Sequence, residues 1–577
     1  MNSTLNLTSR IFHGAALWSS ALAIFLAMNI VGAHASEPEI SSGTPEAGAL
    51  KSRPVNTFQT VAYHVDLRTQ VMPINALKAL AKEVRSLGFN ALIMEWEATY
   101  PYRHHAIISN RYAYTRKEIS DFIKYSESLG LDVIPLQQSL GHVEYILRHE
   151  RYAYLRADPK DFSQIDPTRI AQARELFTDL YDDMLSMHDS KYIHIGGDET
   201  QLLDCARCIQ AWGNDGDRLG RSKLYVEYMK MIAEIVLAKG KTPLIWADMI
   251  LAHPEAIEKM PKGVIYIDWN YDWNVDRFGS NPKTLIDKYG LSFWGATAVR
   301  SAPDDYNVTS WWRHLDNQAD YIPYAKKAGF SGMVLTSWAT SGTYSYEWFD
   351  SEVVQLLPIR ETYPHSYPHD GFRMNTAAFI ESIRQGDAFD LKAFVEQYAQ
   401  ERFGLTVRES ESLREILTSR FLNERLPIGS EPLSGRKGPP EKAVSVKECL
   451  AQVRDLQKQM TSLKAKRNLQ EFAHFQMQLD LREFYLRFRL IEETAQSAGF
   501  GDEQRIEAVK QLRELLARSR ALDDRFKALF ENSLYASEIK QMSEYRTRKI
   551  VNLYNRLSRN RSARSACQAI SCQADLE

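Results

Sequence analysis

The chain has 577 residues, a formal net charge of −2, 44% hydrophobic residues and 25% charged residues. This composition is typical of a globular protein with a large core, and the length predicts two or more domains. Because the charge is nearly balanced and no basic run or phosphate-binding glycine loop stands out, the sequence does not indicate nucleic acid or an anionic membrane surface as a partner.

The N-terminus has the pattern of a secretory signal peptide. Arg10 precedes an apolar stretch over residues 15–31, and "AHA" at 33–35 is a small-x-small cleavage site. We expect residues 1–35 to be removed, with a retained membrane anchor as the alternative, and residues 36–56 to form a flexible leader. No later segment reaches the roughly 18 apolar residues that span a bilayer. The sequence thus predicts an exported protein, periplasmic or secreted, without a membrane span in the mature chain.

Short apolar runs alternate with helical patterns from residue 57 onward. The runs occupy residues 60–68, 91–98, 131–138, 192–199, 242–249, 263–270, 291–298 and 332–339. Continuous apolar strands between helices are typical of a parallel sheet covered on both faces. The segments 74–88 and 116–130 have the i, i+3, i+4 spacing of helices and end at glycine. These units predict an α/β fold with a (β/α)8 TIM barrel over residues 57–372, and a doubly wound open sheet is the alternative.

Helical patterns continue after the predicted barrel. We expect a helical extension and a Pro/Gly-containing linker over residues 373–442, and a C-terminal α-helical domain over residues 443–577. One apolar face repeats at Leu450, Val453, Leu456, Met460 and Leu463, and another at Ile506, Val509, Leu512 and Leu516. This domain is expected to pack against the barrel or to join copies of the chain into a homo-oligomer.

The five cysteines fit an oxidising compartment. Cys205 and Cys208, in "CARC", form either a local disulfide or half of a metal site. No second CxxC or nearby histidine pair completes a zinc pattern, which favours a disulfide or free thiols. Cys567 and Cys572 are close enough in sequence to pair, and Cys449 is left over.

Polar and aromatic residues stand at the C-terminal end of nearly every predicted strand, the face where a barrel carries its active site. Asp198 and Glu199 end the fourth run, directly after Gly196 and Gly197. Glycines at a strand end let another segment or a ligand approach the backbone closely. At the mouth of an apolar barrel, desolvation and mutual repulsion are expected to raise a carboxyl pKa. One acid can then donate a proton while the other stays charged, as glycoside hydrolysis requires.

The segment "HIGGDE", His194 to Glu199, resembles the catalytic signature of glycoside hydrolase family 20, the β-N-acetylhexosaminidases. Stretches similar to the hexosaminidase D-like branch of that family lie at 64–73, 95–102, 135–147 and 336–350, so the resemblance covers residues 57–360. It implies hydrolysis of terminal β-linked N-acetylhexosamine, GlcNAc or GalNAc, with retention of configuration. The family's nucleophile is the substrate's own 2-acetamido oxygen, which forms an oxazolinium ion, and no cofactor or metal is needed.

The resemblance also implies roles for individual residues. Glu199 corresponds to the general acid and base, and Asp198 to the acid that orients the acetamido group. The substrate-binding candidates are Arg68, Glu97, His142, Trp246, Trp269, Tyr271, Trp294 and Trp338. Core packing or a structural ion pair is the alternative role for each of them. The stretch at 336–350 departs from the family because it lacks the Trp-x-Glu spacing of the larger branch. Glu347 is the candidate replacement, and the choice between GlcNAc and GalNAc stays open.

Two other classes of function remain open. One is a metal-dependent barrel hydrolase that uses His64 and His194 together with the acids, which the metal content of the purified protein would reveal. The other is a non-catalytic carbohydrate-binding protein. Retention of both Asp198 and Glu199 argues against this second class, because a binding module has no use for a proton donor.

Overall fold

The computed structural model describes residues 58–574, apart from residues 201–202, 204, 214, 272–273, 302–303, 305–308, 340–365, 425 and 427–442, and it describes residues 560–574 by their backbone alone. The expected signal peptide and leader, nearly all of the expected linker sequence at 426–442, Glu347, and the side chains of Cys567 and Cys572 therefore lie outside the described residues.

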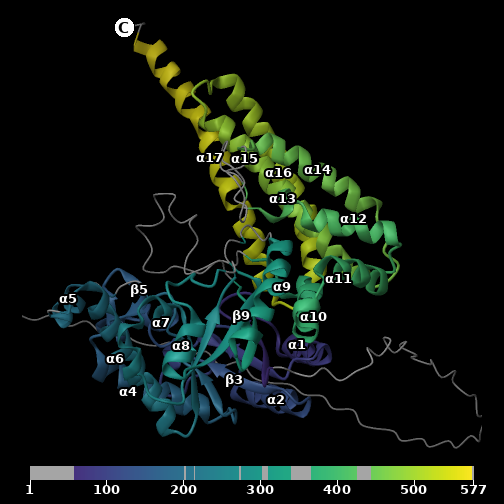
Figure 1. The fold of residues 1–577 in the computed structure, drawn as a ribbon. Coiled ribbons are helices and arrows are strands. Elements are labelled where there is room, and N and C mark those ends of the chain that lie inside the picture. Colours follow the sequence, from purple (N-terminus) through teal and green to yellow (C-terminus); the bar gives the residue numbers. More distant parts are fainter. Residues whose placement is uncertain are drawn as a thin grey trace, which may run out of the picture. The chain divides into compact units, whose positions relative to one another are not determined.

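Eight parallel strands close into a barrel (Figure 1). They are β1 (Thr60–Asp66), β2 (Ala91–Glu95), β3 (Asp132–Leu136), β6 (Tyr192–His194), β7 (Thr242–Trp246), β8 (Ile265–Trp269), β9 (Ser292–Arg300) and β10 (Gly332–Ser337). Around the barrel the strand order is β1-β10-β9-β8-β7-β6-β3-β2. This arrangement confirms the predicted (β/α)8 barrel and rules out the doubly wound sheet. Nearly every strand stops before the polar residues that end its predicted run.

Helices follow most strands and cover the outside of the barrel (Figure 1). They are α1 (Ile74–Leu87), α2 (Arg116–Ser128), α4 (Ile170–Leu185), α6 (Asp217–Ala238), α8 (Pro282–Tyr289), α9 (Trp311–Ala328) and α10 (Arg373–Gln385). Thr115 and Glu118 form a capping box that starts α2. Gly88 ends α1 with a φ of 124°, a conformation that other residues adopt only with strain.

Shorter elements follow several strands at the C-terminal face of the barrel. After β3 come α3 (Glu144–Leu147) and an antiparallel pair, β4 (Arg156–Asp158) and β5 (Asp161–Ile165). After β6 comes α5 (Ala206–Trp212), and after β7 comes α7 (Asp248–Ala252). The backbone N–H groups of Ile165 and Val143 donate to Leu140 and Ser163. These bonds hold β5 against the loop that carries His142.

The predicted C-terminal helical domain is present. It follows α11 (Leu391–Tyr398) and α12 (Val407–Thr418), and consists of α14 (Val446–Ser462), α15 (Leu469–Gln496), α16 (Asp502–Phe530) and α17 (Ala536–Ala574). Each of these four helices packs against the next in sequence (Figure 1). The predicted core face of α14 is buried, but that of α16 is rotated, since Ile506 is 55% exposed while Ala508, Leu512 and Leu515 are buried. Within the described part of the chain, no helix is both long and apolar enough to cross a membrane.

Candidate active site

The loop after β6 carries the Asp198–Glu199 pair. Gly196 and Gly197 precede it with φ values of 70° and 97°, in the left-handed region that favours glycine. A Cβ atom on Gly196 would lie 1.9 Å from Gln138 Oε1, and one on Gly197 would lie 2.7 Å from the side chain of Met229. The two glycines therefore allow neighbouring side chains to pack directly against the backbone of the loop.

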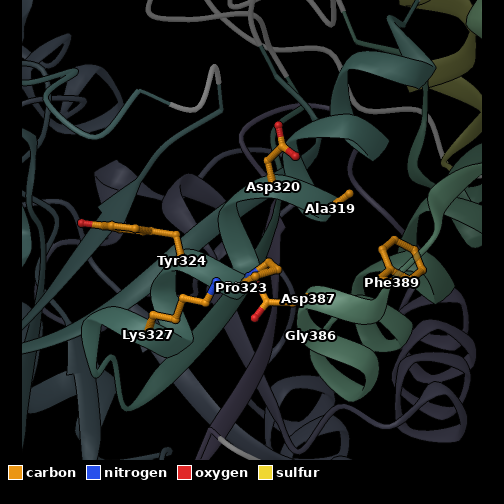
Figure 2. A pocket seen from close by; sticks show the side chains of 8 residues that line it. All are labelled: Ala319, Asp320, Pro323, Tyr324, Lys327, Gly386, Asp387 and Phe389. Atoms are coloured by element: carbon orange, nitrogen blue, oxygen red, sulfur yellow. Dashed lines mark hydrogen bonds and ion pairs between the residues drawn. The ribbon is translucent and has the colours of Figure 1, made fainter.

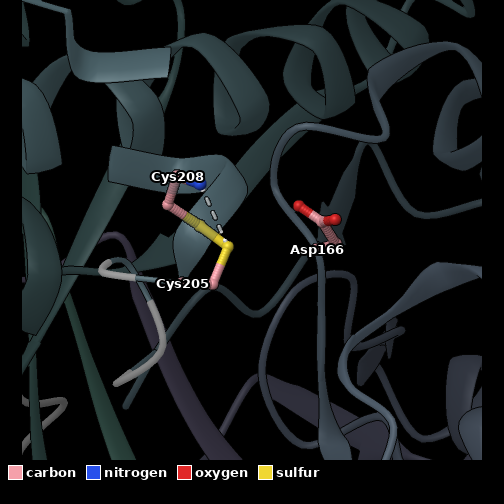
Figure 3. A group of neighbouring side chains, drawn as sticks. All are labelled: Asp166, Cys205 and Cys208. Atoms are coloured by element: carbon pink, nitrogen blue, oxygen red, sulfur yellow. Dashed lines mark hydrogen bonds between the residues drawn. A yellow bond between two sulfur atoms is a disulfide. The ribbon is translucent and has the colours of Figure 1, made fainter. Parts of the chain in front are cut away.

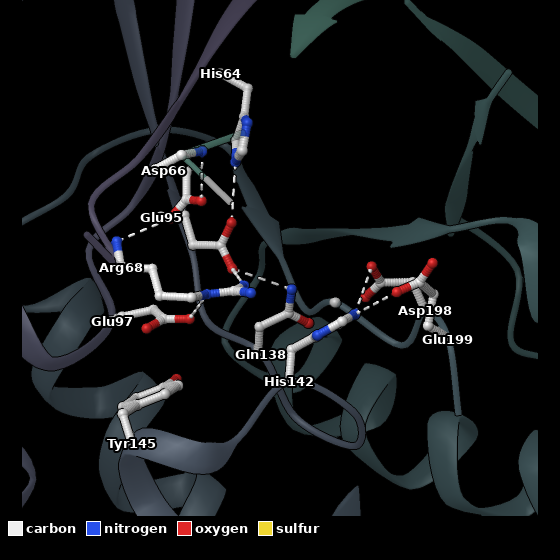
Figure 4. A network of polar contacts seen from close by, with 12 residues as sticks. His64, Asp66, Arg68, Glu95, Glu97, Gln138, His142, Tyr145, Asp198 and Glu199 are labelled. Carbon is white, nitrogen blue, oxygen red and sulfur yellow. Dashed lines mark hydrogen bonds and ion pairs between the residues drawn. The ribbon is translucent and has the colours of Figure 1, made fainter. Parts of the chain in front are cut away.

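His142 brings the two carboxyl groups together. Its Nε2 atom lies 3.3 Å from Asp198 Oδ2 and 3.3 Å from Glu199 Oε2 (Figure 4). The Asp198 side chain is 8% exposed, whereas that of Glu199 is 40% exposed. The adjacent acids thus share one imidazole, with one acid buried and the other open to solvent. Of these three residues, the sequence assigned the acids from the motif and His142 from the resemblance.

The electrostatics of the pair differ from the expectation. Burial favours a high pKa for Glu199, but the hydrogen bond and charge of His142 outweigh it and lower that pKa below its usual value. Burial opposes the charging of His142, yet Asp198 and Glu199 raise its pKa well above normal. By contrast, burial and the nearby charge of Asp198 raise the pKa of Asp248 to about 8. Of these carboxyl groups around the acid loop, the one held neutral at pH 7 is therefore Asp248, and not Glu199 as expected.

Asp248 contacts the acid loop from β7's side of the barrel. Its Oδ2 atom accepts a hydrogen bond from the backbone N–H of Glu199 at 2.8 Å, and its Oδ1 atom accepts one from Trp269 Nε1 at 3.1 Å. Glu199 has a φ of 48°, a left-handed conformation that costs an L-residue about 1–2 kcal/mol. The hydrogen bond to Asp248 stabilises this strained backbone.

Arg68 lies between two buried carboxylates from the end of β2. Arg68 Nε donates to Glu97 Oε1 at 2.8 Å and Arg68 Nη2 to Glu95 Oε1 at 3.3 Å (Figure 4). Burial favours a high pKa for Glu95, but His64 and Arg68 lower it to about 2. Burial raises the pKa of Glu97 to about 8, with a further contribution from ionised Glu95. Gln138 Nε2 donates to Glu95 Oε1 at 3.1 Å and links this network to the acid loop.

Aromatic residues form the adjacent part of the site. Trp338 Nε1 donates to Tyr271 Oη at 2.8 Å, and the Trp338 ring lies 4.5 Å from that of His64. Trp246 is fully buried beneath them, with ring centroids 5.7 Å from Trp338 and 4.3 Å from His194. These predicted residues therefore come together at the C-terminal ends of β7, β8 and β10.

Trp269 joins the same aromatic group. Its ring lies 5.3 Å from Tyr271, and the guanidinium of Arg277 stands over it at 4.8 Å. Arg277 also contributes to the low pKa of Glu199. No sequence signal identified Arg277, because it lies eight positions beyond the strand end in a loop without a motif.

The expectation for Trp294 is corrected. Trp294 is the third residue of β9, and it pairs with Gly332, the first residue of β10. Its Nε1 atom donates to Ser331 Oγ at 3.1 Å, and its ring packs 5.2 Å from that of Tyr192, the first residue of β6. Trp294 therefore fills the barrel at the N-terminal ends of the strands and does not line the site.

The CxxC pair forms a disulfide. Cys205 and Cys208 are bonded to each other at the start of α5, and Asp166 lies beside them (Figure 3). Among the described residues, Asp166, Cys205 and Cys208 form a group of three potential metal ligands whose ligand atoms lie within 4.8 Å of one another. However, its sulfur atoms are in the disulfide and Asp166 is ion-paired with Arg207. The metal-dependent alternative requires His64 and His194 to form such a group with the acids. Within that same part of the chain, they do not.

A separate pocket of 430 Å³ lies between α9 and the turn at Gly386–Ala388 (Figure 2). Its lining includes Tyr324, Phe389, and the ion pair between Lys327 and Asp387, in which both side chains are exposed. None of the predicted site residues lines it. The pocket is therefore distinct from the acid pair.

Comparison with known proteins finds relatives of the barrel region. Residues 92–279 match the sequence model of "Glycosyl hydrolase family 20, catalytic domain". The chain is 27% identical to hexosaminidase D of Bos taurus over 61% of this chain and 99% of that protein, and 28% identical to hexosaminidase D of Homo sapiens over 52% and 63%. A chitobiase structure from Flavobacterium johnsoniae aligns with a TM-score of 0.41 and 16% identity, covering 87% of this chain and 73% of that chain. Residues 92–279, which run from β2 to β8, thus match a glycosyl hydrolase family 20 catalytic domain, and the chain is similar in sequence to hexosaminidase D.

Proposed function

We propose that this protein is an exported β-N-acetylhexosaminidase that removes terminal β-linked N-acetylhexosamine with retention of configuration. The reaction is substrate-assisted, so that the acetamido oxygen of the substrate attacks its own anomeric carbon. The family of the barrel and the relatives of the chain support the hexosaminidase activity. The geometry of the acid pair supports the substrate-assisted mechanism.

One observation carries the mechanism. Asp198 Oδ1 is a buried carboxylate oxygen that has no hydrogen-bond partner among the described residues, while Asp198 Oδ2 is held by His142. A buried acceptor without a donor is unfavourable, and an amide N–H satisfies it. The acetamido N–H of a bound sugar is such a donor. Glu199, on the same imidazole but 40% exposed, is free to reach the oxygen on the leaving side of that sugar.

These positions give each acid a separate task. Glu199 protonates the departing glycosidic oxygen while the acetamido oxygen bonds to the anomeric carbon and the glycosidic bond breaks. Asp198 accepts the acetamido N–H and stabilises the positive charge of the oxazolinium ion. Glu199 then takes a proton from the water that opens this ion. Because His142 lowers the pKa of Glu199, substrate must raise that pKa, which it does by excluding water from the carboxyl group.

The surrounding residues fit the remaining parts of an N-acetylhexosamine. Trp338 and Tyr271 supply aromatic surface for the acetamido methyl and the sugar ring, with the fully buried Trp246 packed against Trp338. Arg68 and Glu97 form a hydrogen-bonded pair of polar groups suited to sugar hydroxyl groups. Two features support export, namely the signal-peptide pattern at residues 1–35 and the disulfide, which persists in an oxidising compartment.

The test is a hydrolysis screen with variants of both acids. Wild-type protein should cleave aryl β-N-acetylglucosaminides or galactosaminides and leave the matching glucosides intact. Glu199→Gln should keep its fold and lose about 10²–10⁴-fold in turnover. Asp198→Asn should also weaken binding of a thiazoline that mimics the oxazolinium ion. Asp387→Asn, which changes an exposed ion pair, is the control and should match wild type. Equal cleavage of glucosides would contradict substrate assistance.

A further inference from the structure

Asp248 is a buried acid that the mechanism above does not use. It is the first residue of α7, separated from the end of β7 by Ala247, and it is 5% exposed. Its two carboxyl oxygens each accept one N–H group, from the Glu199 backbone at 2.8 Å and from the Trp269 indole at 3.1 Å. In the described ranges of the chain it forms no ion pair with a lysine, arginine or histidine. Its environment is therefore that of a hydrogen-bond acceptor and not of a salt bridge.

The two bonds tie together parts of the site that come from different strands. Glu199 is held at its carboxylate by His142 and at its backbone by Asp248. Trp269 ends β8, next to β7 in the barrel, and packs against Tyr271. Through Asp248, the backbone of the acid and the aromatic wall that faces the sugar are fixed to one carboxyl group. Because the pKa of Asp248 is raised to about 8 by burial and by Asp198, it adds little negative charge beside the acid pair at neutral pH.

We propose that Asp248 is a positioning residue that fixes the backbone of the general acid Glu199 relative to the aromatic wall formed by Trp269 and Tyr271. The inference rests on the proposed function, since it presumes that Glu199 transfers a proton to the leaving group. A misplaced acid transfers its proton poorly, while binding of the sugar and attack by the acetamido oxygen are much less affected.

A purely structural role for Asp248 would slow all substrates equally. The dependence of the rate on the leaving group therefore tests the positioning role. Leaving groups that are stable anions, such as 2,4-dinitrophenolate, depart without protonation, whereas phenolate needs the acid. With aryl N-acetylglucosaminides, Asp248→Ala should lower kcat about 100-fold for the phenyl substrate and less than about 5-fold for the dinitrophenyl substrate. Asp248→Asn keeps one acceptor oxygen and should lie between Asp248→Ala and wild type. Thermal unfolding of each variant establishes that it is folded. If Asp248→Ala does not fold, Asp248→Asn is used for the comparison of the two substrates.

Two further variants complete the design. Trp269→Phe removes the indole donor and part of the ring, so its effect on the leaving-group dependence should reproduce part of that of Asp248→Ala and add nothing to it, whatever its effect on sugar binding. Asp268→Asn is the matched control, because Asp268 is also a buried acid at a strand end but bonds to Tyr321 Oη at 2.8 Å, on α9. It should show no leaving-group dependence.

The outcomes separate the two proposals. A wild-type protein that cleaves no N-acetylhexosaminide overturns the proposed function. An active wild-type protein, together with Asp248 variants that are as active as wild type or lose rate equally on both substrates, overturns the positioning role and leaves the function intact.

Discussion

His142 lowers the pKa of Glu199, the proposed catalytic acid, so its replacement should move the pH dependence of hydrolysis. At 3.3 Å, an imidazolium and a carboxylate attract by about 5 kcal/mol at an effective dielectric constant of about 20 and by about 1.3 kcal/mol in water. The Glu199 side chain is 40% exposed, so solvent screens the pair toward the lower value, about 1.5–2 kcal/mol. One pKa unit corresponds to about 1.4 kcal/mol. Removing the charge in His142→Gln should therefore raise the pKa of Glu199 by about one unit.

The sign of the effect follows from the role proposed for Glu199. The acid acts in its protonated form, so kcat/KM falls as the pH rises through its pKa in the free enzyme. Because His142 lowers that pKa, its removal extends the protonated form to higher pH. The basic limb of kcat/KM should move up by about one pH unit in His142→Gln, while the maximum rate falls because both acids lose their shared donor. The measurement is kcat/KM for a phenyl N-acetylglucosaminide across the pH range in which the protein stays folded.

A matched control is available elsewhere in the chain. His105 Nε2 lies 3.3 Å from Asp179 Oδ2, the same separation as in the His142 pair, but His105 contacts neither acid of the site. His105→Gln should leave the limb in place. A basic limb that stays fixed or moves down in His142→Gln would refute the reasoning, since either result means that the charge of His142 does not depress the pKa of the acid.

Two stability predictions follow from the same structure. Gly196→Ala should lower the unfolding midpoint strongly and reduce activity, because the new Cβ atom would lie 1.9 Å from Gln138 Oε1. Gly213 is the control, since it has a similar φ of 59° but no atom lies within 4 Å of a Cβ added there. Gly213→Ala should therefore lower the midpoint only through backbone strain. Burial raises the pKa of Glu97 to about 8, so the folded state binds its proton more tightly than the unfolded state and loses stability as the pH rises from about 4.5 to 8. Glu97→Gln should remove that part of the slope in urea unfolding between these pH values, and an unchanged slope would show that Arg68 keeps Glu97 ionised.

The barrel could be predicted from sequence because its strands are buried on both faces. Such strands are continuous apolar runs, and each of the eight runs overlaps one strand. Most predicted runs extend beyond the C-terminal end of the strand, because the pattern of residue types continues into the turn after the backbone hydrogen bonds between strands have ended. The face of α16 was harder to predict because three-residue and four-residue steps fit more than one register. Packing against α15 and α17 selects the face with Leu512 and Leu515, and leaves Ile506 exposed.

The site was predictable where a motif defined it and not elsewhere. Asp198 and Glu199 stand in a contiguous signature. The end of the run 242–249 placed Asp248 at the correct face of the barrel without giving it a role, and no local pattern connects Arg277 to the site. Trp294 shows the opposite error. A tryptophan in a barrel strand was expected at the site, but the height of a residue along the barrel depends on where its strand begins. β9 begins at Ser292, so Trp294 lies near the opposite end from Trp246 and Trp338.

The adjacency of the two acids poses a geometric problem that the loop solves. Consecutive side chains on an extended strand point to opposite faces, so Asp198 and Glu199 on a continued β6 would be directed apart. The strand ends at His194, and the two glycines turn the backbone through the left-handed region. Glu199 then adopts a φ of 48° itself, which brings its carboxylate back to the imidazole that already holds Asp198. The strain of about 1–2 kcal/mol at Glu199 is thus the means by which neighbours in sequence come to face one imidazole. Any replacement that relaxes this residue to a negative φ should separate the two carboxylates, even if both acids are retained.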